Sequence, residues 1–418
     1  MKYAVTFAEK HGGEEQSTLA RQMARTKRRA KLQALALIAP LMLFLVVVLV
    51  LPIGTLLARG FDNGDAAALL PRTAEALSAW NGQDAPHEEL FAALAGDLKE
   101  AAREDVAVLA KQLNYHDAGM RSMFLKLARK VRTAEAPYAP SFIEVNEDWS
   151  SPRYWRALQQ VMPSVTDFYI LSALDLMRDE NGDIASVPPS TAVNLEVLAR
   201  TFTVSASVTV MCLLLGYPLA ALIARSRGTA ANVLIVLVLL PFWTSLLVRT
   251  SAWVVLLQSR GVVNNVLAWL GMIDPEAPLD LIYNRVGVVI AMTHILLPFM
   301  ILPIYSVMKG IPPVYMRAAA SLGARPLSSF FRVYLPMTMP GVSAGCLLVF
   351  ILALGYYITP ALVGGPRDQM ISYFIAYYAN QVTNWGMAAA LSIILLVAVL
   401  VLYVIYNRLV GIQRLRIG

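Results

Sequence analysis

Long apolar runs constrain the fold of this chain more than any other feature of its sequence. About six stretches reach the roughly 20 mainly apolar residues that a helix needs to cross the hydrocarbon core of a bilayer. They cover 32–57, 197–224, 232–257, 286–308, 341–362 and 387–407. Lipid offers no hydrogen-bond partner to a bare backbone N–H or C=O, so each run is predicted to be a helix. The chain is 57% hydrophobic and 15% charged, which favours an all-α membrane protein with six transmembrane helices.

Basic residues gather in alternate loops between these runs. They are Arg21, Arg25, Lys27, Arg28, Arg29 and Lys31; Arg225 and Arg227; Lys309, Arg317, Arg325 and Arg332; and Arg408, Arg414 and Arg416. By the positive-inside rule, this pattern predicts that both termini are cytoplasmic. A net charge of +7 would also suit a nucleic-acid-binding arm at the N-terminus. The position of the charges beside the runs favours a lipid bilayer as the partner and no nucleic acid.

The pattern divides the chain into five predicted parts. These are a basic cytoplasmic segment at 1–30, a first transmembrane helix at 31–58, an insert at 59–195, a core of five transmembrane helices at 196–410 and a cytoplasmic tail at 411–418. A helix from about Glu14 is expected to lead into the first span. The insert holds about 20 of the 28 acidic residues and no membrane-length run, so it is expected to fold outside the membrane on the periplasmic side.

Apolar residues in the insert recur at helical spacing. The pattern predicts helices over 88–132, with a break between Asn114 and Gly119. A further amphipathic stretch runs from Trp155 to Leu176 with an interruption at Pro163, and a turn follows at 181–183. The insert is therefore predicted to be a small helical cap.

Motifs that would indicate an enzyme are missing from the sequence. No G-x-x-x-x-G-K-[ST] loop or H-E-x-x-H pair occurs, and His11, His87, His116 and His294 have no metal-ligand spacing. We therefore expect no catalytic residue, no metal site and no cofactor bound by this chain. His294 lies within a span and is interpreted as a helix–helix hydrogen bond. Cys212 and Cys346 are interpreted as packing residues.

The segment from Arg317 to Pro340, RAAASLGARPLSSFFRVYLPMTMP, separates the fourth and fifth runs. A helix from about Pro312 to Leu322 is predicted to end at Gly323 in the left-handed conformation. Pro326 is placed to begin a second helix, which is predicted to run to about Tyr334 and to end at Leu335-Pro336. An ordinary amphipathic helix at the membrane interface would also explain the pattern.

This segment resembles the EAA motif of ABC importer permeases. Arg317-Ala318-Ala319, then Gly323, then Val333-x-Leu335-Pro336 keep every spacing of that motif, although Arg317 stands where the family has glutamate. The resemblance implies that 311–340 is the coupling loop that contacts the ATPase. The residues expected to carry this role are Arg317, Ala318, Ala319, Gly323, Leu335 and Pro336.

Three further stretches, at 241–250, 297–303 and 359–366, look like the spermidine/putrescine branch of these permeases. The resemblance covers about 192–410 and excludes the insert. It implies the fold of a type I ABC importer permease in the bacterial inner membrane. It also implies three partners: an ABC ATPase dimer that binds ATP and Mg²⁺, a second and different homologous permease chain, and a periplasmic solute-binding protein.

Polar and aromatic groups inside spans are candidates for the substrate pathway, because they are expensive to place in lipid. The candidates are Arg249, Trp243, Tyr356, Tyr357 and Thr359. Two interpretations stay open for Arg249: a role in the pathway, or a structural role in which it reaches the interface or pairs with an acid such as Asp368. The tyrosines could equally belong to an interfacial aromatic belt. Members of the polyamine branch often carry an acid where Tyr356 stands, so cation–π contacts or an acid from the partner permease would have to take that role.

The sequence therefore predicts a transporter subunit that is not itself an enzyme, with a polyamine as the expected cargo. A different small charged solute, such as an amino-acid-derived compound, is the alternative cargo. A membrane assembly or sensor subunit that uses the acidic insert as a receptor is the alternative class. A secondary transporter would require a buried coupling acid and inverted repeats, and the spans show neither clearly.

Overall fold

The computed structural model describes residues 27, 31, 33–64, 66–179 and 182–410. It divides into two compact units, Met1–Ala58 and Arg59–Gly418. In the first unit a helix over Gln33–Ala58 is long and apolar enough to cross a membrane. It contains a π-helical turn, η1 (Val46–Val50), followed by α2 (Leu51–Ala58). The predicted helix from Glu14 lies outside the described residues.

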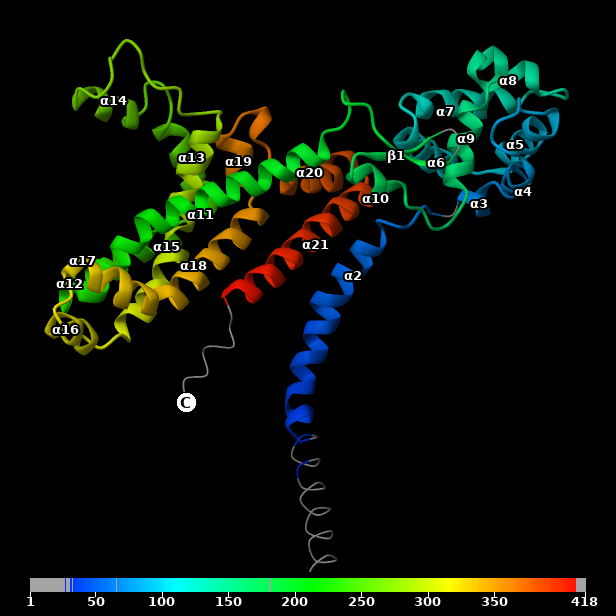
Figure 1. Cartoon of the computed structure of the whole chain (residues 1–418). Helices are drawn as coiled ribbons and strands as arrows, with labels where there is room; N and C mark the ends of the chain where they lie inside the picture. Colours follow the sequence, from blue (N-terminus) through cyan, green and yellow to red (C-terminus); the bar gives the residue numbers. More distant parts are fainter. Residues whose placement is uncertain (1–26, 28–30, 32, 65, 180–181, 411–418) are drawn as a thin grey trace, which may run out of the picture. The chain divides into compact units, whose positions relative to one another are not determined.

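Four more helices of membrane length belong to the second unit (Figure 1). They include α11 (Asn194–Arg225), α15 (Arg285–Lys309), α18 (Leu335–Gly355) and α21 (Trp385–Val410). Together with the helix in the first unit they make five candidate spans in the described part of the chain, or six if one bent pair counts as a span. The predicted class of an all-α membrane protein is confirmed.

The third predicted span is the bent pair. It consists of α12 (Thr229–Leu239), the short 3₁₀ turn η3 (Leu240–Trp243) and α13 (Leu246–Leu256), with a bend of 98° between the two halves. A straight helix over 232–257 was the wrong expectation. Pro241 supplies no N–H to a continuing helix. Ser245 then starts α13 afresh, because its hydroxyl accepts a hydrogen bond from the N–H of Val248 at 3.2 Å.

The fifth run also divides. α18 ends at Gly355, Tyr356 is extended, and α19 (Ile358–Val363) follows as a separate short helix. A helix continued through 341–362 would place the ring of Pro360 against the carbonyl of Tyr356, four residues earlier, which explains the break. The run therefore forms a long helix and a short one at its end.

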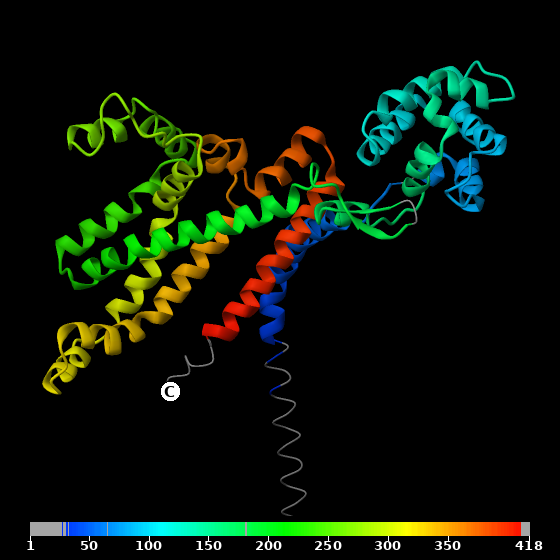
Figure 2. The same cartoon turned by 45° about the horizontal axis from the view of Figure 1, so that its top comes forward.

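Helices α11, α15 and α18 pack side by side (Figures 1 and 2). Small residues allow the close approach: a Cβ on Gly341 would lie 2.9 Å from the Pro303 carbonyl oxygen, and one on Gly345 would lie 2.9 Å from the Met300 sulfur. Helices that cannot gain from the hydrophobic effect in lipid depend on such contacts. The shared core includes Val204, Val208, Cys212, Met292, Leu296, Met300 and Val349.

Short elements lie at the two ends of these helices. Figure 1 shows α16 (Val314–Ser321) and α17 (Pro326–Ser329) at one end of α15 and α18, with α13 and α19 at the other. The remaining elements are α14 (Val262–Trp269), η4 (Phe330–Tyr334), η5 (Pro366–Asp368), α20 (Ile371–Tyr377) and η6 (Tyr378–Val382).

The insert is a helical bundle. Its elements are α3 (Ala66–Leu69), α4 (Pro71–Ala79), α5 (Glu88–Glu100), α6 (Arg103–His116), α7 (Met120–Val131), α8 (Ala139–Val145), η2 (Glu147–Ser150), α9 (Pro152–Val161) and α10 (Phe168–Ala173). The predicted break at 114–119 is confirmed, with Gly119 at φ +96°, and a second break falls between α5 and α6. One small antiparallel sheet, β1 (Leu176–Arg178) with β2 (Ile184–Ser186), was not expected.

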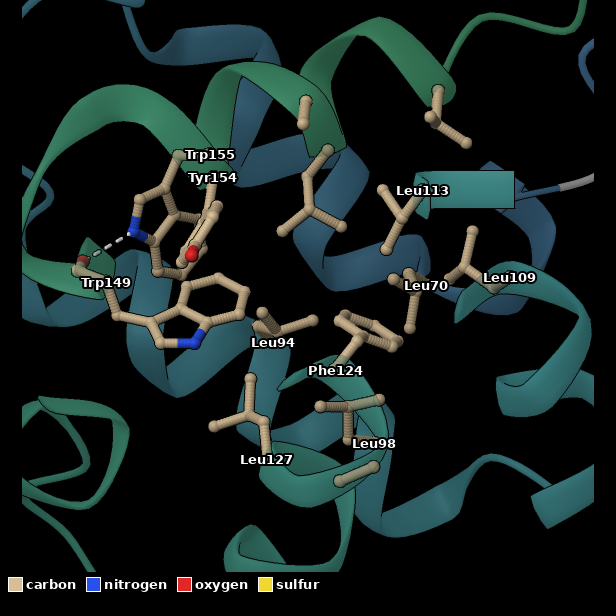
Figure 3. Close-up of a cluster of buried hydrophobic side chains, with 14 of the residues drawn as sticks. Leu70, Leu94, Leu98, Leu109, Leu113, Phe124, Leu127, Trp149, Tyr154 and Trp155 are labelled. Atoms are coloured by element: carbon tan, nitrogen blue, oxygen red, sulfur yellow. Dashed lines mark hydrogen bonds between the residues drawn. The ribbon is translucent and has the colours of Figure 1, made fainter. Parts of the chain in front are cut away.

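Aromatic rings form one side of the core of the insert (Figure 3). Trp149 and Trp155 are fully buried, and the Nε1 of Trp155 donates to the Trp149 carbonyl at 3.0 Å. Phe91 meets Phe142 and Trp155 edge to face, with centroids 5.1 Å apart in each pair. Such pairs add to the stabilisation from area burial alone. The bundle thus has a hydrophobic core of its own.

Candidate coupling loop and substrate pathway

The coupling segment begins with α16, which ends where the sequence predicts. Gly323 has φ +79°, and the N–H of Ala324 donates to the Ala319 carbonyl at 3.1 Å while the N–H of Gly323 donates to Ala320 at 3.0 Å. These two bonds and the left-handed glycine form a Schellman motif, which satisfies the last carbonyls of the helix. The predicted geometry at Gly323 is therefore confirmed.

The second helix of the segment does not end at Leu335-Pro336, as was predicted. It starts at Pro326, passes through the π-helical turn η4 and continues into α18, so that 326–355 is one helical stretch. The N–H of Leu335 bonds to the Phe330 carbonyl, five residues back. This wider turn relieves the clash that Pro336 would make with the carbonyl four residues before it. The same arrangement occurs in the first unit, where η1 immediately precedes Leu51-Pro52.

The candidate coupling residues lie at the surface of this segment. Arg317, Ala318, Gly323 and Pro336 are exposed, whereas Ala319 and Leu335 are half-buried. Arg317 forms no ion pair with any described residue. Its guanidinium is thus directed to no acid that this part of the chain supplies.

The three most exposed apolar side chains of the segment were missed by the sequence analysis. Leu322 is 88% exposed, Leu327 74% and Phe331 60%. Large apolar groups exposed together usually mark a surface that another molecule covers. The spacing of four residues between Leu327 and Phe331, on one face of a helix, was the signal that could have found them.

The candidate pathway residues divide into two groups. The first lies where α13 meets α15 and α19. The Thr250 hydroxyl lies 3.2 Å from that of Thr359, and both side chains are buried. The Trp253 Nε1 donates to His294 Nδ1 at 3.1 Å, so the predicted helix–helix hydrogen bond of His294 is confirmed. The first contact holds α19 against α13, and the second holds α13 against α15.

Arg249 belongs to this first group and precedes Thr250 on α13. Its charge lies close enough to His294 and Tyr356 to act on both. Its Nε is buried without a hydrogen-bond partner among the described residues. Pairing with Asp368, one of the interpretations left open by the sequence, is wrong, because Asp368 contacts Arg285 at 3.4 Å and accepts a hydrogen bond from the Gly365 N–H at 3.2 Å.

The second group is the pair of exposed aromatic residues. Trp243, at the end of η3, is 75% exposed, and Tyr357, between α18 and α19, is 43% exposed. Both stand at the breaks in the third and fifth predicted spans. The structure thus brings Arg249, Tyr356 and Thr359 into one region, whereas Trp243 and Tyr357 are exposed.

Comparison with known proteins decides the family. Residues 216–417 match the family described as "Binding-protein-dependent transport system inner membrane component". The chain is 35% identical over 213 residues to the spermidine/putrescine transport system permease protein PotB of Escherichia coli K12. The aligned region covers 51% of this chain and 77% of that protein. The chain belongs to this family of permeases.

Other relatives have different cargoes or none stated. The chain is 33% identical over 232 residues to the inner membrane ABC transporter permease protein YdcU of E. coli K12, covering 52% of this chain and 72% of that protein. It is 32% identical over 210 residues to the molybdenum transport system permease protein ModB of Mycobacterium bovis, covering 50% of this chain and 76% of that protein. The family match leaves out the insert.

Membership fixes the general role. The chain is a multi-pass inner-membrane permease subunit of a type I ABC importer, and it is a transporter component rather than an enzyme. ATP hydrolysis belongs to a separate subunit of such a transporter. The segment 311–340 and the region around Arg249 both lie within the residues that match the family.

Proposed function

We propose that this permease forms half of a translocation pathway for polyamines such as spermidine and putrescine. The supporting observation is the 35% identity with PotB over half of the chain. The aromatic side chains around the breaks in the third and fifth spans suit a polyamine, because the face of an aromatic ring attracts an ammonium group. Tyr356, which is half-buried at the break in the fifth span, offers its ring for that contact.

The partners follow from the same proposal. An ABC ATPase dimer binds ATP and Mg²⁺ and docks on 311–340, while a second, homologous permease completes the pathway and a periplasmic binding protein delivers the cargo. Both termini then lie in the cytoplasm and the insert lies in the periplasm, as the distribution of arginine and lysine indicates. No nucleic acid takes part.

The coupling loop would transmit ATPase closure to the spans. The exposed Leu322, Leu327 and Phe331 supply an apolar surface for a partner, and the Schellman motif at Gly323 fixes the angle between α16 and α17. Because η4 continues without a break into α18, a push on α17 would move the fifth span directly. A loop that ended at Leu335-Pro336 would lack that rigid connection.

Disulfide cross-linking tests the docking of the ATPase. Leu322→Cys is paired in turn with single cysteines on the ATPase surface, in the assembled transporter in membranes. Val108→Cys is the matched control, because Val108 is also a strongly exposed apolar residue but belongs to the insert. We expect cross-links at position 322 and none at 108. Equal cross-linking at both positions, or at 108 alone, would contradict the proposed orientation and coupling surface.

A further inference from the structure

The insert contains a cavity of about 1110 Å³. The residues that line it all lie outside the part of the sequence that matches the family. Its walls come from the end of α6, from α9 and α10, and from β1. The volume slightly exceeds the range of about 300–1,000 Å³ that small-molecule sites occupy. Val165, which is 71% exposed, and Met177, which is 44% exposed, line the cavity and are not part of the hydrophobic core. Exposed apolar groups within a hollow favour a ligand with apolar parts.

Strand β1 forms one wall and offers an unpaired edge. The sheet has two strands in the order β1-β2, and the cavity is lined by residues of β1 and by none of β2. Backbone hydrogen bonds join Val187 to Asp175 and Asp179 to Asp183, at 3.0 and 2.9 Å. Because paired residues alternate along an antiparallel ladder, the backbone groups of Leu176 and Arg178 point away from β2. Within the described part of the chain no strand covers this edge.

Charges around the cavity balance. Its lining holds three arginines and three aspartates: Arg153, Arg156, Arg178, Asp117, Asp167 and Asp179. Arg153 contacts Asp117 through two hydrogen bonds of 2.6 and 2.9 Å, and Arg178 is paired with Asp167. His116 adds no charge at pH 7, because burial lowers its pKa to about 4. Because the cavity lining has no net charge, it gives no electrostatic preference for a polyamine or for a polyanion.

We propose that this cavity binds an extended polypeptide segment of a partner protein, which adds to β1 as a third strand. The outward N–H and C=O groups of Leu176 and Arg178 would pair with every second residue of that segment. Apolar side chains of the segment would contact Val165 and Met177, and its charged side chains of both signs would meet the balanced Arg–Asp pairs. The site is separate from the polyamine pathway and does not depend on which cargo is carried.

Binding of a defined peptide to the full chain in lipid nanodiscs tests the proposal. The probe is a fluorescent, capped octapeptide in which valine alternates with glutamate and lysine at zero net charge. Its comparison is the same peptide methylated on every backbone amide nitrogen, which cannot donate a strand-pairing hydrogen bond from either edge. We expect the unmethylated peptide to bind at least tenfold more tightly, measured by fluorescence anisotropy. Equal affinity of the two peptides would overturn the proposal.

Two substitutions locate the site. Arg178→Pro removes an outward N–H that β2 does not use, and Arg178→Ala is its matched control because it removes only the side chain. We expect the proline variant to bind about threefold to tenfold more weakly than the alanine variant, the effect of one lost hydrogen bond. Val165→Trp fills the cavity from an exposed position and should abolish binding without touching the core. Unchanged binding in both Arg178→Pro and Val165→Trp would overturn the proposal.

Competition experiments test two other classes of ligand for the cavity. Spermidine and free phenylalanine are added at increasing concentration to the bound peptide, and neither is expected to displace it. Displacement by spermidine would make the cavity a cargo site, and displacement by phenylalanine would make it a small-zwitterion site; either result overturns the peptide proposal. The assay contains no transport step, so its failure leaves the proposed import of polyamines standing.

Discussion

His116 illustrates how a single residue of the insert responds to burial. Its ring stacks on Phe168 with centroids 3.8 Å apart, its Nδ1 contacts Gln160 Oε1 at 3.3 Å, and its Nε2 is covered. Burial lowers its pKa from 6.5 to about 4. The unfolded chain therefore binds more protons than the folded chain between these values, and stability falls as pH drops from about 6.5 towards 4.

The expected size of this effect is at most about 3.5 kcal/mol, since one pKa unit corresponds to about 1.4 kcal/mol. His116→Leu removes the titrating group and should flatten the pH dependence of the melting temperature between pH 6.5 and 4. The measurement is thermal unfolding of the full chain in nanodiscs across that range, with His87→Leu as the control for an exposed histidine. The same slope in wild type and His116→Leu would contradict the assigned pKa.

Tyr356 is predicted to contact the polyamine through its aromatic ring. Tyr356→Leu removes an aromatic ring from the proposed pathway, and a cation–π contact is worth about 0.5–2 kcal/mol. We therefore expect the KM for spermidine uptake to rise about twofold to thirtyfold. Tyr356→Phe keeps the ring and is expected to behave as wild type. A leucine variant with unchanged uptake kinetics would remove Tyr356 from the pathway.

Gly323 is predicted to be required for coupling between the ATPase and the membrane helices. It has φ +79°, and a Cβ there would meet no atom within 4 Å, so the cost of Gly323→Ala is backbone strain, about 1–2 kcal/mol. Strain at this position should distort the angle between α16 and α17. We expect spermidine uptake to fall at least tenfold while the affinity of the binding protein for spermidine stays unchanged.

Gly119→Ala is the control for Gly323→Ala. Gly119 also has positive φ with open space around it, but it lies in the insert. If the two alanine variants reduced uptake equally, general destabilisation rather than coupling would explain the effect.

The aromatic core of the insert supports a prediction about that element as a folding unit. Trp155→Ala removes a fully buried ring and its hydrogen bond to Trp149, so the free energy of unfolding of the insert should fall by about 3–5 kcal/mol. Hydrogen exchange followed by mass spectrometry should show lost protection in α4 to α9 and normal protection in α15 and α18. Loss of protection throughout the chain would show that the insert and the membrane helices unfold together.

Element positions follow from the sequence where one physical effect dominates. Membrane-length apolar runs located the long helices, and Gly323 located the end of α16, because hydropathy and left-handed backbone are local properties. The breaks at Thr244 and Tyr356 and the continuous helix at Pro336 were missed. In each case a proline was present, but whether it ended, bent or merely widened the helix depended on hydrogen bonds that neighbouring residues make in three dimensions.

The candidate sites show the same division. The coupling segment could be found from spacing along the chain, whereas its exposed surface of Leu322, Leu327 and Phe331 depends on what α16 and α17 leave uncovered. The partner of Asp368 proved to be Arg285 rather than Arg249, since α15 and not α13 places a guanidinium beside it. The cavity beside β1 depends on a hairpin that the sequence analysis did not anticipate.

At the scale of the whole molecule, the chain combines a permease core with an additional helical insert. The core, within 216–417, carries the family match, the coupling loop and the proposed pathway. The insert has its own hydrophobic core and a cavity with balanced charge. We therefore expect translocation of the cargo to depend on the core, and binding of a further partner protein to depend on the insert.

ATP-driven uptake in proteoliposomes tests whether this permease imports polyamines. The chain would be assembled with its partner permease, ATPase and binding protein, with ATP on the ATPase side and labelled spermidine with the binding protein on the other. The proposed function predicts accumulation of spermidine that requires ATP and is lost in Gly323→Ala. Absence of ATP-dependent accumulation in an assembled complex with active ATPase, or full accumulation by the Gly323→Ala complex, would contradict it.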